Sequence, residues 1–228
     1  MEFIKAKIIL TGATGMVGEG VLHECLSHES VEKVLLISRK PTGISHPKLE
    51  EAIQADMRDL RNLSEEICEY DTCFYCIGTT SMGKTEEEYK AVTYQLTIDF
   101  ANALLSVNHE ITFCYISAAG SDLSERGKTM WARVKGRTEN KLMVLPFACF
   151  YSFRPLMLTP TPGMKHTHGF YKFISWFFPI GRLLKPDWFC TLRELGQAMI
   201  AVALNGYPRR IIEVRDIADI ANRANSRK

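Results

Sequence analysis

A glycine-rich turn near the beginning of the sequence constrains the fold more than any other stretch. Residues 7–18 read KIILTGATGMVG, so an apolar run passes directly into glycines at positions 12, 15 and 18. The apolar run is typical of a buried strand, and the residues from about Gly15 onward have the apolar spacing of a helix. A strand, a glycine turn and a helix N-terminus in this order bring backbone N–H groups close to a pyrophosphate. We therefore expect a dinucleotide site rather than a merely tight turn. The predicted contacts are Gly12, Thr14, Gly15, Met16, Val17 and Gly18.

Strand and helix patterns alternate along the rest of the chain. Strands are predicted at residues 8–11, 31–38, 49–55, 71–77, 111–117, 147–153 and 211–214. Helices are predicted from about residue 15 and over residues 85–107, 128–144, 192–204 and 215–223. This alternation predicts an α/β fold of the Rossmann type, a doubly wound parallel sheet with helices on both faces. We expect residues 1–228 to form one domain, with a small, irregular substrate-side region at about residues 160–190.

Composition excludes some classes of partner. The 228 residues are 46% hydrophobic and 24% charged, which is ordinary for a globular protein with a substantial core. A net charge of +2 and scattered basic residues give no field that favours a nucleic-acid partner. No stretch approaches the ~20 apolar residues of a membrane span. Seven cysteines without framework spacing, and no signal peptide before the first strand, predict a cytoplasmic location.

Three local features could indicate redox chemistry, metal binding or a membrane interface, but each has a simpler interpretation. Cys73 and Cys76 form a C-x-x-C, yet in a strand these positions point to opposite faces, so inert buried thiols are expected. His166 and His168 have no further clustered ligand, so no metal site is predicted. The aromatic run at residues 170–178 suits a helix that lines a pocket or a dimer surface better than a membrane interface, which stays the weaker alternative.

The residues after the second predicted strand bear on the choice of nucleotide. An acid at this point would bind the ribose 2′-OH of NAD, but the chain has Ser38, Arg39 and Lys40. Arg39 can pair with a 2′-phosphate and stack on adenine, although an ordinary solvated arginine is the alternative. We therefore expect NADP(H) as the preferred cofactor, with NAD(H) as the second choice.

Other strand ends are expected to complete the cofactor pocket. Asp56 and Met57 follow the third predicted strand and are expected to flank the adenine. Gly78 and Thr79 follow the fourth, where a glycine admits the cofactor and a threonine hydroxyl can reach the ribose.

These motifs resemble the atypical short-chain dehydrogenase/reductases, in particular the Tat-interacting-protein-like and NmrA-like NAD(P)-binding proteins. The resemblance runs in order from residue 7 to about residue 160 and weakens after that. The matching stretches are residues 11–18, 38–39, 76–80 with Gly83 and Lys84, 116–120, 134–136 with Glu139, and 153–155. The resemblance implies a Rossmann fold and an NAD(P) cofactor, with Pro155 among the residues around it.

The resemblance also implies a catalytic arrangement, from which this chain departs at one position. In the family a serine positions the substrate carbonyl, a tyrosine donates the proton, and a lysine four residues later holds the nicotinamide ribose. Ser117 and Lys135 occupy the matching places, but Trp131 replaces the tyrosine. An indole N–H can donate a hydrogen bond but cannot release a proton near neutral pH. Tyr89 and Tyr94 are candidate substitute acids.

Trp131 leaves two functions open. The first is an NADP(H)-dependent oxidoreductase that acts on an unidentified small carbonyl or alcohol. The second is a non-catalytic NADP(H)-binding protein that senses redox state or binds partners. Arg154 is expected either to reach the pyrophosphate or to support the end of its strand. The sequence predicts neither the substrate nor the oligomeric state.

Overall fold

Seven parallel strands form the central sheet of the computed structural model, which describes residues 5–161, 164, 181 and 186–226. The strands are β1 (Ala6–Thr11), β2 (Val31–Ser38), β3 (Leu49–Ile53), β4 (Thr72–Tyr75), β5 (Thr112–Ile116), β6 (Cys149–Arg154) and β9 (Ile211–Glu213). Their spatial order is β3-β2-β1-β4-β5-β6-β9. The order changes direction between β1 and β4, so this is where the crevice at the carboxyl ends opens. The predicted α/β fold of the Rossmann type is confirmed.

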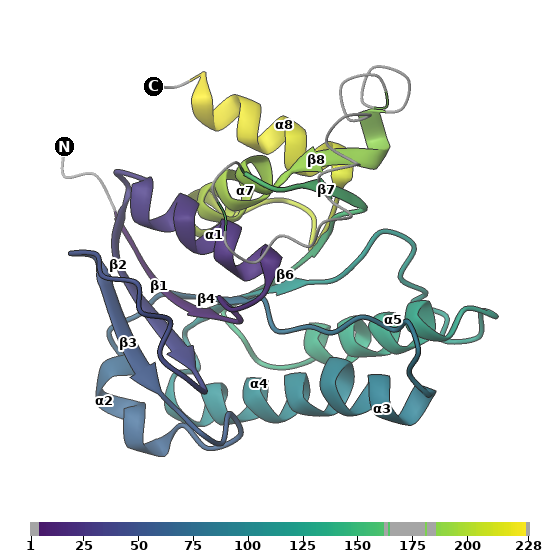
Figure 1. The fold of residues 1–228 in the computed structure, drawn as a ribbon, viewed down its shortest axis with the longest axis horizontal. Helices are drawn as coiled ribbons and strands as arrows, with labels where there is room; N and C mark the ends of the chain where they lie inside the picture. Colours follow the sequence, from purple (N-terminus) through teal and green to yellow (C-terminus); the bar gives the residue numbers. More distant parts are fainter. Residues whose placement is uncertain (1–4, 162–163, 165–180, 182–185, 227–228) are drawn as a thin grey trace.

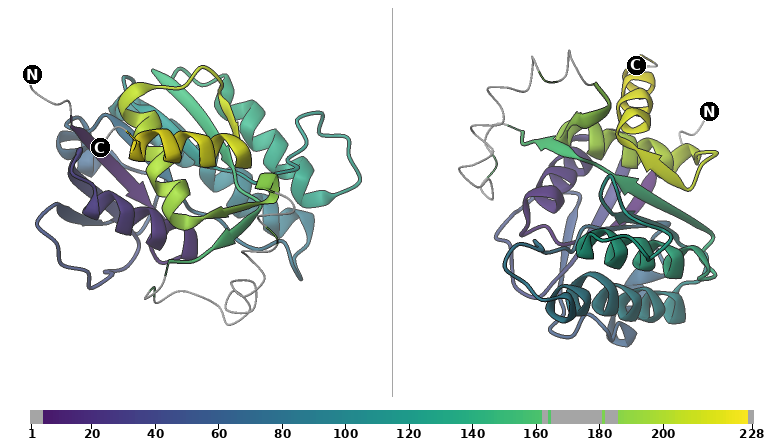
Figure 2. Two further views of the ribbon diagram at one scale, coloured as in Figure 1. Left: turned by 90° about the horizontal axis from the view of Figure 1, so that it is seen from above. Right: turned by 90° about the vertical axis from the view of Figure 1, so that its right-hand side faces the viewer.

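Helices cover both faces of the sheet (Figures 1 and 2). One face carries α1 (Met16–Ser27), α7 (Leu192–Asn205) and α8 (Val214–Asn225). The other carries α2 (Ser64–Ile67), α3 (Glu86–Lys90), α4 (Leu96–Val107) and α5 (Met130–Met143), with the short 3₁₀ turn η1 (Arg61–Leu63) before α2.

Alternate residues of each strand supply the two cores on either side of the sheet. In β1, Ile8 and Leu10 pack under α1 and α7, whereas Ile9 packs on the opposite side. Cys73 belongs to that second core and Cys76 packs against the first. This confirms that the two thiols lie on opposite faces and do not converge.

The predicted helix over residues 85–107 has an interruption. A capping box between Thr85 and Glu88 begins α3, and the π-helical turn η2 (Ala91–Gln95) separates it from α4. The carbonyl of Thr93 accepts hydrogen bonds from the hydroxyls of Thr97, at 2.9 Å, and Thr138, at 3.2 Å. Side-chain hydroxyls that occupy a carbonyl in this way compete with the regular helix ladder, which accounts for the local widening.

A small second sheet was not predicted. It consists of β7 (Met157–Thr159) and β8 (Phe189–Thr191), which follows the 3₁₀ turn η3 (Pro186–Trp188). Three-residue strands are too short to produce an alternating pattern. Within the predicted irregular segment at about 160–190, the described residues 186–190 form η3 and the beginning of β8, and the segment as a whole stays a prediction. The predicted features at His166, His168 and residues 170–178 lie outside the described residues.

The described residues contain no helix that is long and apolar enough to cross a membrane. They also contain no cluster of three or more histidine, cysteine, aspartate or glutamate side chains suited to a metal ion.

Candidate cofactor and catalytic site

The glycine turn between β1 and α1 is shaped by close backbone approaches. Gly12 has φ +78°, and a Cβ there would lie 2.7 Å from the Cys76 carbonyl carbon. A Cβ on Gly18 would lie 2.2 Å from the carbonyl oxygen of Gly12. The N–H of Gly15 donates to that same oxygen at 3.0 Å, which closes the turn. Larger residues at 12 or 18 would push α1 away from the sheet.

The N-terminus of α1 is open. Gly15 is its N-cap and supplies no side-chain cap. Thr14 and Gly15 are exposed, and Met16 and Val17 are half-buried. The first N–H groups of a helix have no partner within the helix, and they carry the positive end of its dipole. The turn therefore fits the pyrophosphate of a dinucleotide, because donors are available and no side chain of the described residues caps the helix.

Arg39 is exposed directly after β2. The Ser38 hydroxyl donates to the Lys40 carbonyl at 2.7 Å and fixes the bend of the chain there. Within residues 5–161, two other arginines near this edge are held by carboxylates: Arg58 by Asp56 and Arg61 by Asp59. Arg39 has no such ion pair among the described residues, so its guanidinium is available to an anion.

Of the two residues that follow β3 in the predicted pocket, Asp56 is exposed and Met57 is buried. The Asp56 carboxylate accepts hydrogen bonds from the Arg58 backbone N–H at 3.0 Å and its Nε at 2.8 Å. These bonds hold the pKa of Asp56 below its ordinary value. The Met57 side chain is 4% exposed and packs in the core. A contact to adenine by either residue stays a prediction.

The segment after β4 approaches the glycine turn, since the Cys76 backbone lies against Gly12. Gly78 is exposed and Thr79 is half-buried. In the part of the chain that the structure describes, apart from the two neighbouring residues, no atom lies within 4 Å of the position of a Cβ on Gly78, so the space beside this backbone is open. Such space is consistent with the predicted approach of a cofactor.

Ser117 lies directly after β5, where its N–H donates to the Phe153 carbonyl at 2.8 Å. Its buried hydroxyl is 2.9 Å from the hydroxyl of Ser121, which donates to the Ala118 carbonyl at 2.8 Å. Ser121 was not predicted from the sequence, because a spacing of four residues brings two hydroxyls together outside a helix only when the loop turns sharply. Gly120, at φ +85°, provides that turn.

Lys135, on α5, reaches the end of the same strand. Its Nζ donates to the Ile116 carbonyl at 3.3 Å and lies 5.2 Å from the centre of the Tyr115 ring. Burial lowers the pKa of Lys135 to about 8, and the negative charge of Glu139 opposes this effect. The structure therefore brings the lysine to the residue that precedes Ser117.

Trp131 lies one helical turn before Lys135 and is half-buried. A Cβ on Gly120 would lie 3.5 Å from its Cη2, so the indole packs on the loop after β5. Tyr89 is 2% exposed, and its pKa is raised by burial. The ring of Tyr94 lies 4.8 Å from the guanidinium carbon of Arg137. Neither tyrosine has a described contact with Ser117 or Lys135.

Arg154 and Pro155 lie at the end of β6, beside the loop that carries Ser117. The Arg154 guanidinium is committed to Glu139 and Glu213, which favours the support of the strand end over a pyrophosphate contact. Pro155 is buried, and its carbonyl accepts a hydrogen bond from Ala119 at 2.9 Å. Pro155 thus fixes the loop that carries Ser117.

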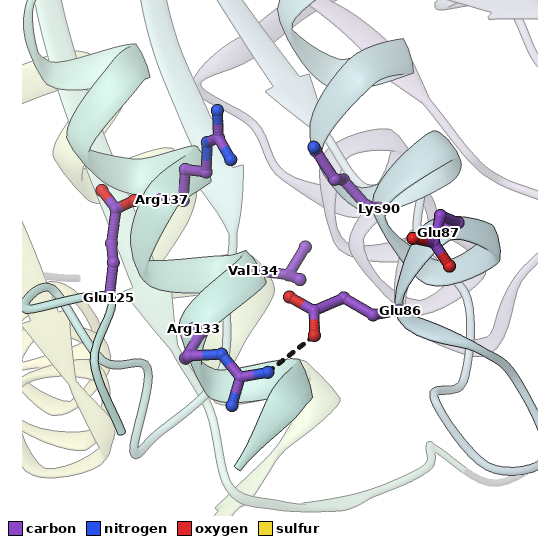
Figure 3. Close-up of a pocket in the computed structure, with 7 residues that line it drawn as sticks. All are labelled: Glu86, Glu87, Lys90, Glu125, Arg133, Val134 and Arg137. Carbon is purple, nitrogen blue, oxygen red and sulfur yellow. Dashed lines mark hydrogen bonds and ion pairs between the residues drawn. The ribbon is translucent and has the colours of Figure 1, made fainter. Parts of the chain in front are cut away.

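A polar groove lies between α3 and α5 (Figure 3). It is crossed by an ion pair between Arg133 and Glu86, at 2.6 Å. Its lining residues are Glu86, Glu87, Lys90, Glu125, Arg133, Val134 and Arg137. None of them is a predicted cofactor or catalytic residue, so this groove is not the predicted site.

Comparison with curated proteins finds several fungal relatives. Leucinostatins biosynthesis cluster protein T of Purpureocillium lilacinum is 33% identical over 144 residues, 60% of this chain and 51% of that protein. The chain thus spans about half the length of that relative. Protein fmp52, mitochondrial, of Emericella nidulans is 25% identical over 216 residues, 88% of this chain and 90% of that protein.

These relatives correct one prediction. Several of them, from different fungi, carry names that include the word mitochondrial. The prediction of a cytoplasmic location is therefore wrong on this comparison. Cysteine usage indicates a reducing environment but does not distinguish between reducing compartments.

Solved structures share the fold at low sequence identity. The Bordetella bronchiseptica enzyme WbmF in complex with NAD+ has a TM-score of 0.64 at 14% identity, covering 99% of this chain and 79% of that chain. Helicobacter pylori ADP-L-glycero-D-manno-heptose-6-epimerase has a TM-score of 0.61 at 15% identity, covering 96% and 82%.

A model of a protein family matches the sequence and assigns the chain to that family. It covers residues 8–124, which include the glycine turn, Arg39 and Ser117, and thus about half of the chain. The narrower Tat-interacting-protein-like and NmrA-like assignment stays a prediction. The chain belongs to the NAD dependent epimerase/dehydratase family.

Proposed function

We propose that this protein is an NADP(H)-dependent oxidoreductase that acts on a small carbonyl or alcohol substrate. The observation that carries the proposal is the open N-terminus of α1 behind a turn that only glycine can form. Family membership supports a nicotinamide cofactor but not the choice between NAD and NADP.

Arg39 supports the choice of NADP(H). It is an exposed arginine at the end of β2, where the nucleotide ribose is expected, and it has no ion pair within the described part of the chain. Its planar guanidinium can form two parallel hydrogen bonds with a 2′-phosphate.

The residues at the end of β5 support a reductase rather than a passive binder. Reduction of a carbonyl needs a hydride, which the nicotinamide supplies when bound, and a proton, which the protein or water must supply. In this proposal Ser117 orients the substrate oxygen. Lys135 holds a ribose hydroxyl, and its pKa of about 8 suits it also to supply the proton that Trp131 cannot.

A turnover assay tests this proposal. NADPH oxidation is followed across a panel of aldehydes and ketones with the wild type and the Lys135→Met variant. We expect turnover with at least one compound and a loss of roughly 10²–10⁴-fold on removal of the lysine, the range for a general acid. Lys141→Met, an exposed lysine on the same helix, is the matched control and is expected to keep full turnover. A Lys135→Met variant as active as the wild type would contradict the assigned role.

A non-catalytic NADP(H)-binding protein is the second candidate, and Trp131 is the observation that favours it. The same assay with Trp131→Tyr separates the two functions. If the wild type is inert and the tyrosine variant gains turnover, the indole silences an otherwise complete site, and the sensing function is favoured. If the wild type turns over, the oxidoreductase proposal stands.

A further inference from the structure

A fully buried carboxylate lies on the inner side of α5, one turn beyond Lys135. The Glu139 side chain has no exposed area. It accepts hydrogen bonds from the Ser152 hydroxyl at 2.9 Å, from Arg154 Nε at 3.0 Å and from Arg154 Nη2 at 2.5 Å. This carboxylate has no part in the contacts at the end of β5 described above.

The ion pair continues across the sheet to a second helix. Nη1 of Arg154 donates to Glu213 at 3.0 Å. Glu213 is also the N-cap of α8, where its side chain and that of Asp216 form a reciprocal capping box. The arginine thus connects α5, β6 and the start of α8.

Stability alone does not explain such a pair. Desolvation of two charges costs about as much as their attraction returns, and apolar residues of similar size are often as stable. A buried pair that stability does not account for can act instead on a neighbouring functional group.

The neighbouring functional group on α5 is Lys135. The two residues are four positions apart and so lie on the same face of α5. Burial disfavours the Lys135 ammonium, and Glu139 is the charge that favours it. Among the described residues, the ammonium also contacts the Tyr115 ring and the Ile116 carbonyl, both from β5. Among the described residues, Glu139 is the carboxylate that acts on this lysine.

We propose that Glu139 is a positioning residue, whose carboxylate, fixed by Arg154 and Ser152, keeps the Lys135 ammonium charged and directed at the end of β5. The inference rests on the proposed function, in which Lys135 is the residue that contacts cofactor and substrate.

The test is the titration of Lys135 in the cofactor-free protein, followed by NMR of ¹³Cε-labelled lysine. The Lys135 signal is identified by its absence in Lys135→Met. Glu139→Gln keeps the shape and removes the charge, so we expect the titration midpoint to fall by roughly one pH unit. Glu213→Gln is the matched control, because it removes the other carboxylate on Arg154, and its midpoint is expected to equal that of the wild type.

Two results would overturn the inference. One is a folded Glu139→Gln variant with an unchanged midpoint. The other is an equal fall in Glu213→Gln, which would mean that the effect passes through Arg154 rather than through the Glu139 charge. If Glu139→Gln does not fold, the double variant Glu139→Met with Arg154→Met leaves no unpaired buried charge. A smaller fall of the midpoint is expected of it, because the neighbouring guanidinium charge is removed as well.

The titration also separates this inference from the proposed function. NADPH binding to the wild type is measured in parallel. Absence of binding would contradict the proposed function, while the midpoints would still decide whether Glu139 controls Lys135.

Discussion

At the scale of single residues, Lys135 shows how far sequence reasoning reaches. Its distance along the chain from Ser117 and the resemblance to a known family predict its place at the end of β5, and the structure gives it a hydrogen bond to the Ile116 carbonyl there. The sequence did not predict the pKa of Lys135, because this pKa depends on burial and on the charge of Glu139. The Glu139 carboxylate is in turn held by Arg154, which lies on β6.

The depressed pKa of Lys135 predicts a pH dependence of stability. Its ordinary value is 10.5, and burial lowers it to about 8 in the folded protein. Below pH 8 the lysine is protonated in both states, and the full cost of its buried charge is present. Between about 8 and 10.5 the unfolded chain binds more protons, so the free energy of unfolding gains a rising contribution with pH.

Urea denaturation of the wild type and Lys135→Met at several pH values measures this contribution. The variant is expected to be more stable than the wild type below pH 8, and this advantage is expected to shrink as the pH rises towards 10.5. A difference that stays constant with pH would mean that the ammonium is not disfavoured by folding.

At the scale of elements, apolar runs predicted the inner strands of the main sheet, because strands covered on both faces need continuous apolar side chains. The edge strand β3, which contains Glu50 and Glu51, and the short β9 were predicted from weaker patterns. What the sequence missed depends on contacts between elements. The π-helical turn forms where the Thr138 hydroxyl of α5 meets the Thr93 carbonyl. Gly136 is one of the residues that match the resembled family. The reason for a glycine at this position is seen only in the structure, where α5 packs on the loop after β5.

That packing predicts the effect of a substitution at Gly136. A Cβ there would lie 1.8 Å from the Asp122 carbonyl oxygen, whereas one on Gly78 would have no atom of the described, non-neighbouring residues within 4 Å. Gly136→Ala is therefore expected to lower the free energy of unfolding by about 1–3 kcal/mol or more. Gly78→Ala, the matched control, is expected to change it by less than about 0.5 kcal/mol. Equal stabilities in chemical denaturation would show that α5 does not pack closely on the loop.

At the scale of the whole molecule, the reversal of strand order between β1 and β4 directs the predicted cofactor and catalytic residues to one edge of the sheet. The glycine turn follows β1, Arg39 follows β2, Gly78 follows β4 and Ser117 follows β5. Sequence alone predicted this edge, because the carboxyl ends of parallel strands meet there. It did not predict the location in the cell, because cysteine usage indicates a reducing environment but does not distinguish one reducing compartment from another.

The central claim is that the edge binds NADP(H), with the pyrophosphate at the N-terminus of α1 and the 2′-phosphate at Arg39. Isothermal titration calorimetry of NADPH and NADH tests it most directly, with the wild type, Arg39→Gln and the neighbouring Lys40→Gln as the matched control. We predict tighter binding of NADPH than NADH by the wild type, a loss of about 10–100-fold in NADPH affinity in Arg39→Gln alone, and little change for NADH. Absence of binding, or NADH bound as tightly as NADPH by the wild type, would contradict the account.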